Sequence, residues 1–215
     1  MEQAGWRARV KRTFDRTAAA LGLVVAAPIM ATTAAAIAVS MGRPVVFRQT
    51  RPGFRGQPFD VFKFRTMRNA VDASGKPLPD AERLTRVGKF IRATSLDELP
   101  QLINVLRGEV SLVGPRPLLM QYLPRYSKEQ ARRHDVMPGI TGWAQIHGRN
   151  AVDWPERFRL DVWYVDNWSL ALDVRILLKT FASVIRREGV NHEGHATMYE
   201  FMGDTPEATA ETSAR

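Results

Sequence analysis

The sequence predicts an α+β protein that is mostly helical, with an N-terminal membrane segment, a β-hairpin and a compact domain with amphipathic surface helices. Three observations support this prediction. Residues 18–41 carry no charge, residues 45–47 and 59–65 have strand-like composition on either side of a Pro-Gly turn, and residues 170–187 repeat apolar side chains at helical spacing. A chain of 215 residues is long enough for one domain with its own core.

The net charge of +9 lies entirely in the first third of the chain. Residues 1–70 carry 12 Lys and Arg against 3 acidic residues, whereas residues 71–215 carry 19 of each kind. A basic first third suits nucleic acid, or anionic lipid headgroups and phosphates. The chain has no cysteine, which excludes disulfides and metal sites built on Cys.

The uncharged run 18–41 is long enough to cross a membrane, since a helix rises 1.5 Å per residue and hydrocarbon is about 30 Å thick. It is too long for a signal peptide, and basic residues follow it directly. Five basic residues precede the run and four arginines follow it, at 43, 48, 51 and 55. Positive charge on both sides favours keeping both ends on the cytoplasmic face.

Pro28 lies near the middle of this run and interrupts the helical hydrogen bonds. We therefore predict a re-entrant helix-break-helix that enters one leaflet, bends at Ala27-Pro28 and returns. A single crossing that contains a proline and a buried helix of a soluble domain are the alternatives.

Residues 43–68 predict a β-hairpin, with strands at 45–47 and 59–65. In the second strand Phe62 and Phe64 face one side, while Lys63 and Arg65 face the other. The two cations suit a bound phosphate or simply a solvated face.

Two adjacent carboxylates, Asp97 and Glu98, open a predicted short helix over 99–107 that ends at Gly108. Ser95 or Asp97 is the expected cap of this helix. The helix dipole should favour the ionised form of Asp97.

Basic residues surround this acidic pair in the sequence. Arg92 ends a predicted helix over 84–92, and Arg116 is held between Pro115 and Pro117. A rigidly held guanidinium suits a phosphate or pyrophosphate, although a rigid turn with an incidental arginine is the alternative. Ionised carboxylates among arginines suit nucleophilic or metal-assisted attack on phosphorus. A capped surface helix with an acidic first turn is the simpler interpretation.

The rest of the chain adds few chemical signals. Residues 69–84 are turn-rich and predict a surface loop, and residues 118–135 predict a helical connector. The Gly-rich stretch 137–150 has neither the G-x-G-x-x-G nor the Walker A spacing, and no histidines form an H-E-x-x-H motif. Aromatic residues crowd 154–168, as core or as interfacial side chains. The helix over 170–187 packs on the domain or lies on a membrane.

Several motifs together resemble the bacterial sugar transferases, the monotopic polyprenol-phosphate phosphoglycosyl transferases. They occur in the family's order: Lys11-Arg12-Thr13-Phe14-Asp15, Phe47-Arg48-Gln49, Lys63-Phe64-Arg65-Thr66-Met67, Thr94 to Gln101, Ser111 to Pro117, Pro138 to Gln145, Gly148-Arg149-Asn150 and Asp161-Val162-Trp163-Tyr164-Val165. The resemblance runs from about Lys11 to Met202 and matches the small members of the family.

The resemblance implies that a sugar 1-phosphate passes from a UDP-sugar to undecaprenyl phosphate, with release of UMP, at the cytoplasmic face of the bacterial inner membrane. Asp97 matches the nucleophile that forms a covalent phosphosugar intermediate. Glu98 matches its partner, which coordinates Mg²⁺ or activates the acceptor phosphate, so both carboxylates are candidate metal ligands. Arg116 matches the arginine that contacts the nucleotide phosphate, and Lys63, Arg65, Arg92 and Arg149 are candidates for phosphate binding.

We therefore expect an anchor at 1–42 and a catalytic domain at 43–202, and the polar composition of residues 203–215 predicts a disordered tail. One departure concerns the anchor, because the family commonly bends at Ser-Pro and this chain has Ala27-Pro28.

Rival functions predict different behaviour. A membrane-anchored module that binds anions or nucleic acid has no use for the Asp97-Glu98 pair, so we expect no nucleic acid as a partner. A membrane scaffold would tolerate loss of Asp97, and a nucleotide-sugar hydrolase would need no lipid acceptor.

Overall fold

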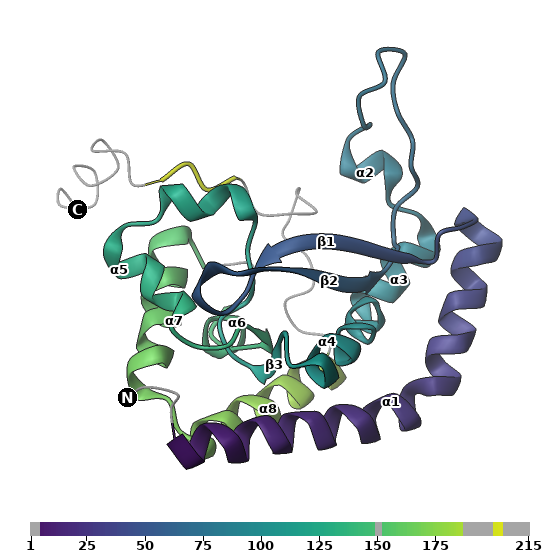
Figure 1. Cartoon of the computed structure of the whole chain (residues 1–215). Coiled ribbons are helices and arrows are strands. Elements are labelled where there is room, and N and C mark those ends of the chain that lie inside the picture. The colour runs from purple at the N-terminus through teal and green to yellow at the C-terminus, as the bar shows by residue number, and fades with distance from the viewer. Residues whose placement is uncertain (1–4, 149–151, 187–199, 204–215) are drawn as a thin grey trace.

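The computed structural model describes residues 5–148, 152–186 and 200–203 (Figure 1). The predicted tail lies outside these residues except for Gly203, and so does Arg149.

Helix α1 (Gly5–Met41) contains the whole uncharged run and has Pro28 inside it. Figure 1 shows α1 running along the lower edge of the molecule and then bending upward. Proline lacks the N–H that a helix interior needs, and kinks of this kind occur at proline. The Thr32 hydroxyl donates to the carbonyl oxygens of Pro28 and Ile29 at 3.1 and 2.9 Å, a local bond that also favours bending.

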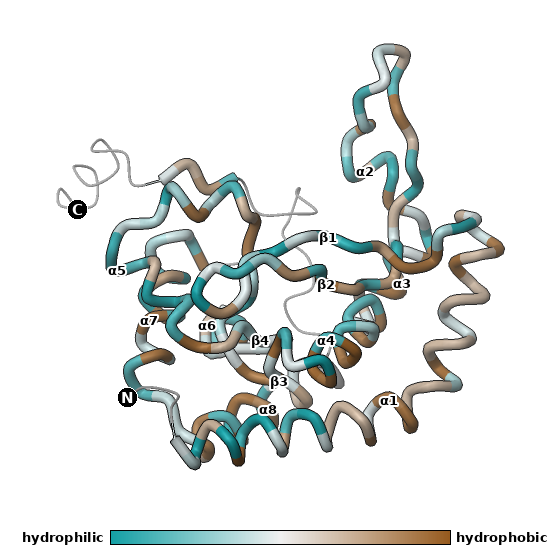
Figure 2. Tube along the Cα trace, viewed as in Figure 1, coloured by the Kyte–Doolittle hydropathy of each residue, from teal (hydrophilic) through white to brown (hydrophobic). Residues whose placement is uncertain are grey.

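Both arms of α1 pack on the same body. In the first arm Ala19 is buried against Val105 and Val110, and in the second Ile37 is buried against Phe64 and Ile91. Most of the remaining apolar surface is exposed: only 17% of its most apolar stretch is buried, and Figure 2 shows mainly brown and pale tones along α1 beyond its largely teal N-terminal part. The alternative of a buried core helix is therefore wrong.

The predicted β-hairpin is confirmed as β1 (Val46–Pro52) and β2 (Pro58–Phe64), joined through the 3₁₀ turn η1 (Phe54–Gly56). The register pairs Phe47 with Lys63, Gln49 with Val61 and Arg51 with Phe59, so these side chains share one face. Asn104 covers the free edge of β2, since it donates to the Asp60 carbonyl at 2.7 Å and accepts from the Phe62 N–H at 3.1 Å.

The segment after the hairpin forms a projecting arm and then the helices that carry the acidic pair. Bridges at Met67–Leu84 and Val71–Pro77 close the arm, which rises above the body in Figure 1 and contains the short helix α2 (Asp80–Arg83). Next come α3 (Arg86–Ala93), η2 (Leu96–Glu98) and α4 (Gln101–Arg107). Gly108 ends α4 in the left-handed conformation, as predicted.

A second small sheet, which the sequence did not reveal, pairs β3 (Ser111–Val113) in parallel with β4 (Gly139–Thr141). The connector between the two strands holds short helices, as predicted: η3 (Met120–Arg125), α5 (Lys128–Ala131) and η4 (Arg132–His134).

The C-terminal part consists of α6 (Trp143–Ile146), α7 (Trp154–Asn167) and α8 (Leu170–Arg186). Trp154, Phe158, Tyr164 and Trp168 are buried, so core packing is the correct interpretation for these aromatics. In α8, Val174, Leu178 and Phe181 stand on one exposed face, at 49%, 67% and 68% exposure.

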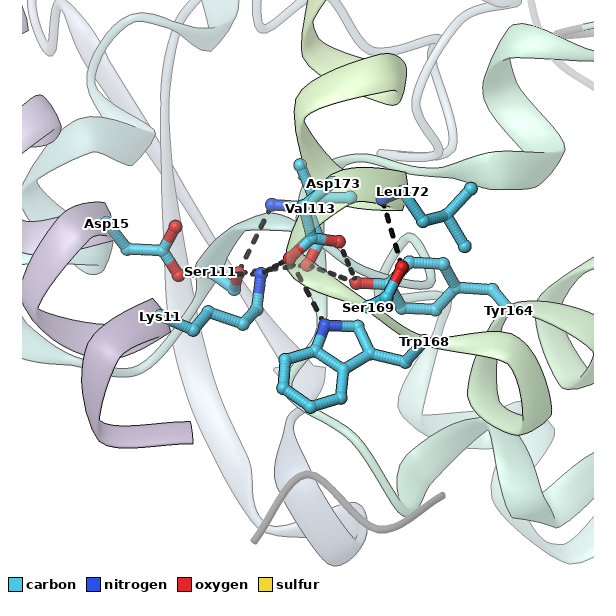
Figure 3. Close-up of polar contacts among 9 residues, drawn as sticks. All are labelled: Lys11, Asp15, Ser111, Val113, Tyr164, Trp168, Ser169, Leu172 and Asp173. Carbon is cyan, nitrogen blue, oxygen red and sulfur yellow. Dashed lines mark hydrogen bonds and ion pairs between the residues drawn. The ribbon is translucent and has the colours of Figure 1, made fainter. Parts of the chain in front are cut away.

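A buried polar network fastens the start of α1 to the body, and Figure 3 shows its members converging from four elements. We call it the clamp; it consists of Lys11, Asp15, Ser111, Tyr164, Trp168 and Asp173. The Lys11 ammonium donates to Asp173 at 2.5 Å, and these side chains are 4% and 8% exposed. Asp173 also accepts from the Tyr164 hydroxyl at 2.7 Å and the Trp168 indole at 3.2 Å, while Ser111 donates to Asp15 at 2.7 Å.

Candidate active site

The acidic pair lies in a tight turn between α3 and α4. Ser95 has a φ of 56°, a left-handed conformation that is strained for serine and that redirects the chain into η2. Neither predicted cap is correct, because Pro100 is the N-cap of α4 and no side chain caps it. The reason is local: the N–H groups of Leu99, Leu102 and Ile103 donate to carbonyls three residues earlier, so the turn runs directly into α4.

Glu98 is an ion-paired carboxylate. Its Oε1 atom accepts from the Lys63 ammonium at 2.9 Å and from the Arg116 guanidinium at 2.5 Å. Burial opposes ionisation of Glu98, but the charges of Arg116 and Lys63 and their hydrogen bonds hold its pKa well below the usual range. Glu98 is therefore ionised throughout the physiological pH range.

Asp97 has the opposite environment. Burial first, and then the negative charge of Glu98, raise the pKa of Asp97 to about 6, against the opposing charges of Lys63, Arg116 and Arg92. Within the described ranges no group donates a hydrogen bond to its carboxylate. The prediction that a helix dipole favours the ionised form is thus wrong, because desolvation and the adjacent carboxylate outweigh it. The result is a half-buried carboxylate that accepts no hydrogen bond from the described residues and stays largely ionised at pH 7.

Arg116 is positioned by its backbone. Its carbonyl oxygen accepts from the Arg133 guanidinium at 2.7 Å. Arg133 in turn forms a buried pair with Asp161 of α7, at 2.7 and 3.0 Å. The prolines restrict the backbone on both sides of Arg116, and this buried pair fixes it in space.

Three glycines fix the same loop by close contact of main chains. A Cβ atom on Gly114, Gly139 or Gly142 would lie within 2.1–2.2 Å of a backbone atom. The Gly114 N–H donates to the Thr141 carbonyl, and the Gly139 N–H to the Pro115 carbonyl. The main chain at the end of β3, just before Arg116, therefore packs against the main chain of β4 more closely than a side chain at these positions would allow.

The other predicted site residues do not all converge. Arg92 donates to the Thr66 hydroxyl at 2.9 Å, and its charge acts on Asp97. Arg65 donates instead to the carbonyls of Met41, Gly42 and Arg43 at 2.5, 2.5 and 3.4 Å, at the end of α1. Phosphate binding by Arg65 stays a prediction, and so does that by Arg149, which lies outside the described residues.

The carboxylates of Asp97 and Glu98 fit a magnesium ion. In the part of the chain that the structure describes, no three acidic or histidine residues form a metal-binding group. Magnesium needs only one or two carboxylates, with water and substrate phosphates completing its octahedron. The Asp97 carboxylate and the second oxygen of Glu98 are free of hydrogen bonds from described residues, so the two side chains can supply such ligands.

Sequence reasoning missed two pairs of residues near the acidic pair. Arg133 and Asp161 lie far from it in the sequence, and no local pattern links them to Arg116. Arg51 and Gln101 flank Lys63 and Arg116 in space. For Arg51 a signal was available in the sequence, because strand alternation places it on the same face of the hairpin as Lys63.

Comparisons with known proteins identify the family of this chain. The bacterial sugar transferase family matches residues 6–187. The uncharacterized sugar transferase EpsL of Bacillus subtilis is 55% identical over 194 residues, covering 90% of this chain and 96% of EpsL.

Two longer relatives carry more specific names. The undecaprenyl-phosphate glucose phosphotransferase of Komagataeibacter xylinus is 44% identical over 85% of this chain and 36% of its own length. The undecaprenyl-phosphate galactose phosphotransferase of Salmonella typhimurium is 41% identical over 84% of this chain and 41% of its own length. The chain thus spans less than half of these two relatives. The match over nearly its whole length shows that the chain belongs to the bacterial sugar transferase family of enzymes.

Proposed function

We propose that this protein is a phosphoglycosyl transferase that moves a sugar 1-phosphate from a UDP-sugar to undecaprenyl phosphate. The products are undecaprenyl-diphospho-sugar and UMP, in the first membrane step of glycoconjugate synthesis. The observation that carries the proposal is the difference within the acidic pair. Asp97 is open and largely ionised at pH 7, whereas Glu98 is neutralised by Lys63 and Arg116. The names of the two longer relatives support the same reaction class.

The transfer takes place in two displacements with Asp97 as the nucleophile. In the first, an Asp97 carboxylate oxygen attacks the sugar-proximal phosphorus, and the bond from that phosphorus to the bridging oxygen breaks. UMP leaves with the bonding electrons. In the second, an oxygen of undecaprenyl phosphate attacks the same phosphorus and the bond to Asp97 breaks, which regenerates the carboxylate.

The charges around Asp97 suit this chemistry. Each displacement brings a second anion to a phosphorus that already carries negative oxygens. Lys63, Arg92 and Arg116 counter that charge in a partly buried site, where electrostatic interactions are stronger than in water. A Mg²⁺ ion held by Asp97 and Glu98 would add neutralisation of the phosphate oxygens.

The packing of α1 supports a re-entrant anchor over 1–42 below the catalytic domain at 43–202. Both arms of α1 contact one body, which favours a topology with both ends of the helix on the same side of the membrane. Pro28 supplies the bend, and the basic flanks favour the cytoplasmic face of the inner membrane. The exposed apolar face of α8 and the basic first third suit contact with anionic lipids.

Intact-protein mass spectrometry tests the mechanism. Detergent-purified protein is mixed with Mg²⁺ and a panel of UDP-sugars, without lipid. We expect one donor to add the mass of a single phosphosugar, and undecaprenyl phosphate to remove it. The Asp97→Asn variant should form no adduct, whereas the matched amide variant Asp72→Asn, in the projecting arm, should form it normally.

The other outcomes would redirect the assignment. UMP release that needs lipid, without any adduct, would make Asp97 a metal ligand in a direct transfer. Release of sugar phosphate without lipid would favour a hydrolase. No reaction with any donor would favour a non-catalytic binding module.

A further inference from the structure

A cavity lies beside the acidic pair, between the hairpin and the start of α4. Its wall includes Phe47, Gln49, Arg51, Lys63, Gln101 and Arg116. Lys63 and Arg116 are also the two cations that hold Glu98, so the cavity and the acidic pair share a wall. Its volume of about 40 Å³ has room for roughly three water molecules. A group of phosphate size fits this space.

The cavity has an excess of positive charge. Three cations line it, against two nearby carboxylates: Glu98, which pairs with Lys63 and Arg116, and Asp97, whose charge acts on the same two cations. The third, Arg51, donates to the Gln49 amide oxygen at 2.5 Å and has no carboxylate partner among the described residues. Burial first, and then repulsion from Arg116, lower the pKa of Arg51 to about 10. Two guanidinium groups held close together in this way favour an anion between them.

Gln101 adds a neutral donor to the same wall. The residue is 3% exposed, and its Nε2 atom has no hydrogen-bond partner among the described residues. A buried donor without a partner is costly, and such groups usually have an acceptor in the functional state. An anion with several acceptor oxygens would satisfy Gln101 and Arg51 together.

We propose that this cavity is a binding subsite for a phosphate monoester, with Arg51 and Gln101 as its specific ligands. The inference rests on the proposed function and extends it, because Arg51 and Gln101 lie outside the acidic pair and its two cations. The phosphate held here is the one that is not attacked by Asp97.

The chemistry of two in-line displacements implies that the subsite is used twice. In each displacement the entering and leaving oxygens lie on opposite sides of the phosphorus. Asp97 occupies one side in both steps, as the entering group and then as the leaving group. The other side is occupied first by the phosphate of UMP and then by the phosphate of the lipid. Both are phosphate monoesters, so one subsite serves both in turn.

Two kinetic measurements on the detergent-purified full chain test this proposal. The first is inhibition of adduct formation by UMP, and the second is the KM for undecaprenyl phosphate when a preformed adduct is discharged. Arg51→Gln removes the unpaired cation, and Gln101→Glu keeps the shape but places a negative charge against the phosphate. We expect each variant to raise the inhibition constant of UMP and the KM for undecaprenyl phosphate by about tenfold or more, because hydrogen bonds to charged groups are stronger than those between neutral groups.

Arg48→Gln is the matched control, because Arg48 is exposed on the opposite face of the same strand, over the ring of Phe62. It should leave both constants within about twofold, and Arg51→Lys should recover part of the loss by restoring the charge. Thermal unfolding confirms that each variant is folded.

The outcomes separate this inference from the proposed function. If the wild-type protein forms no adduct, the proposed two-step mechanism fails, and no test of the subsite is needed. If it forms one and both constants of Arg51→Gln and Gln101→Glu match those of Arg48→Gln, the subsite is wrong. An effect on the UMP constant alone or on the lipid KM alone would assign the cavity to that ligand and overturn its shared use.

Discussion

Two clusters in this protein contain the same kinds of residue and differ in how completely those residues are paired. In the clamp, Lys11 pairs with Asp173, whose carboxylate also accepts from Tyr164 and Trp168. In the active site, Lys63 and Arg116 pair with Glu98, but Asp97 has no donor among the described residues. Gln101 nearby has an unpaired amide in the same part of the structure.

The difference separates structure from chemistry. A buried polar network in which each group has a partner stabilises one arrangement and has no capacity left for a ligand. A cluster that leaves a carboxylate and a donor unpaired is less stable by itself and is completed by substrate. Residue type alone would not distinguish these two clusters.

The largest effect should come from Asp97→Asn, which removes the unpaired carboxylate. We expect transfer activity to fall at least about 10³-fold, as for other lost nucleophiles. The pKa of Asp97 is raised from 3.8 to about 6, so the folded state binds the proton more tightly than the unfolded state does. Its ionised form therefore destabilises the fold above about pH 6. The variant should unfold at a higher temperature than wild type at pH 7.5, and the gain should disappear by about pH 4. A lower unfolding temperature at pH 7.5 would contradict the assignment.

The next largest effect should be on stability alone, from Asp173→Asn in the clamp. Removing one partner of a buried ion pair costs about 3–5 kcal/mol. We expect a large fall in unfolding temperature, while the folded fraction keeps a kcat close to that of wild type. Glu129→Gln breaks an exposed ion pair with Arg132 and should cost under about 1 kcal/mol. A loss of kcat at full folding would give the clamp a catalytic role.

A smaller and directional effect should appear in the pH profile of Glu98→Gln. Glu98 is the second cause of the raised pKa of Asp97, so its loss should lower that pKa. The rate of adduct formation falls in wild type as the pH drops through about 6, and in the variant this fall should occur at lower pH. Arg92→Gln removes an opposing charge and should move the fall to higher pH. If this pH moved in the same direction in both variants, Asp97 would not be the group whose protonation slows the reaction at low pH.

The smallest effect on activity should come from Arg65→Gln. Arg65 binds the carbonyls at the end of α1, so its loss should lower the unfolding temperature. The KM for the UDP-sugar should stay within about twofold of wild type. A clear rise in KM without a stability change would instead support the phosphate-binding role predicted from its motif.

Sequence patterns predicted the parts that depend on local spacing. Strand alternation around Pro52-Gly53 gave the hairpin, and the uncharged run gave α1 with Pro28 inside it. These features need little information beyond neighbouring residues.

Properties that depend on tertiary contacts could not be predicted from the sequence. The pKa of Asp97 depends on burial, which no dipole argument supplies. Lys11 and Asp173, which form an ion pair, are 162 residues apart. Arg65 donates hydrogen bonds to carbonyl oxygens at the end of α1 instead of pointing toward the acidic pair. The capping prediction failed because a strained Ser95 turns the chain before α4 begins.

The glycine contacts around Arg116 affect how losses of activity should be interpreted. Gly114, Gly139 and Gly142 touch no substrate in the proposed scheme, yet none can accept a methyl group without moving the chain that carries Arg116. A mutational scan that scores activity alone would thus assign these three positions to the catalytic machinery. Scored for abundance as well, they would separate from Asp97, because a glycine substitution lowers both readouts and Asp97→Asn lowers only one.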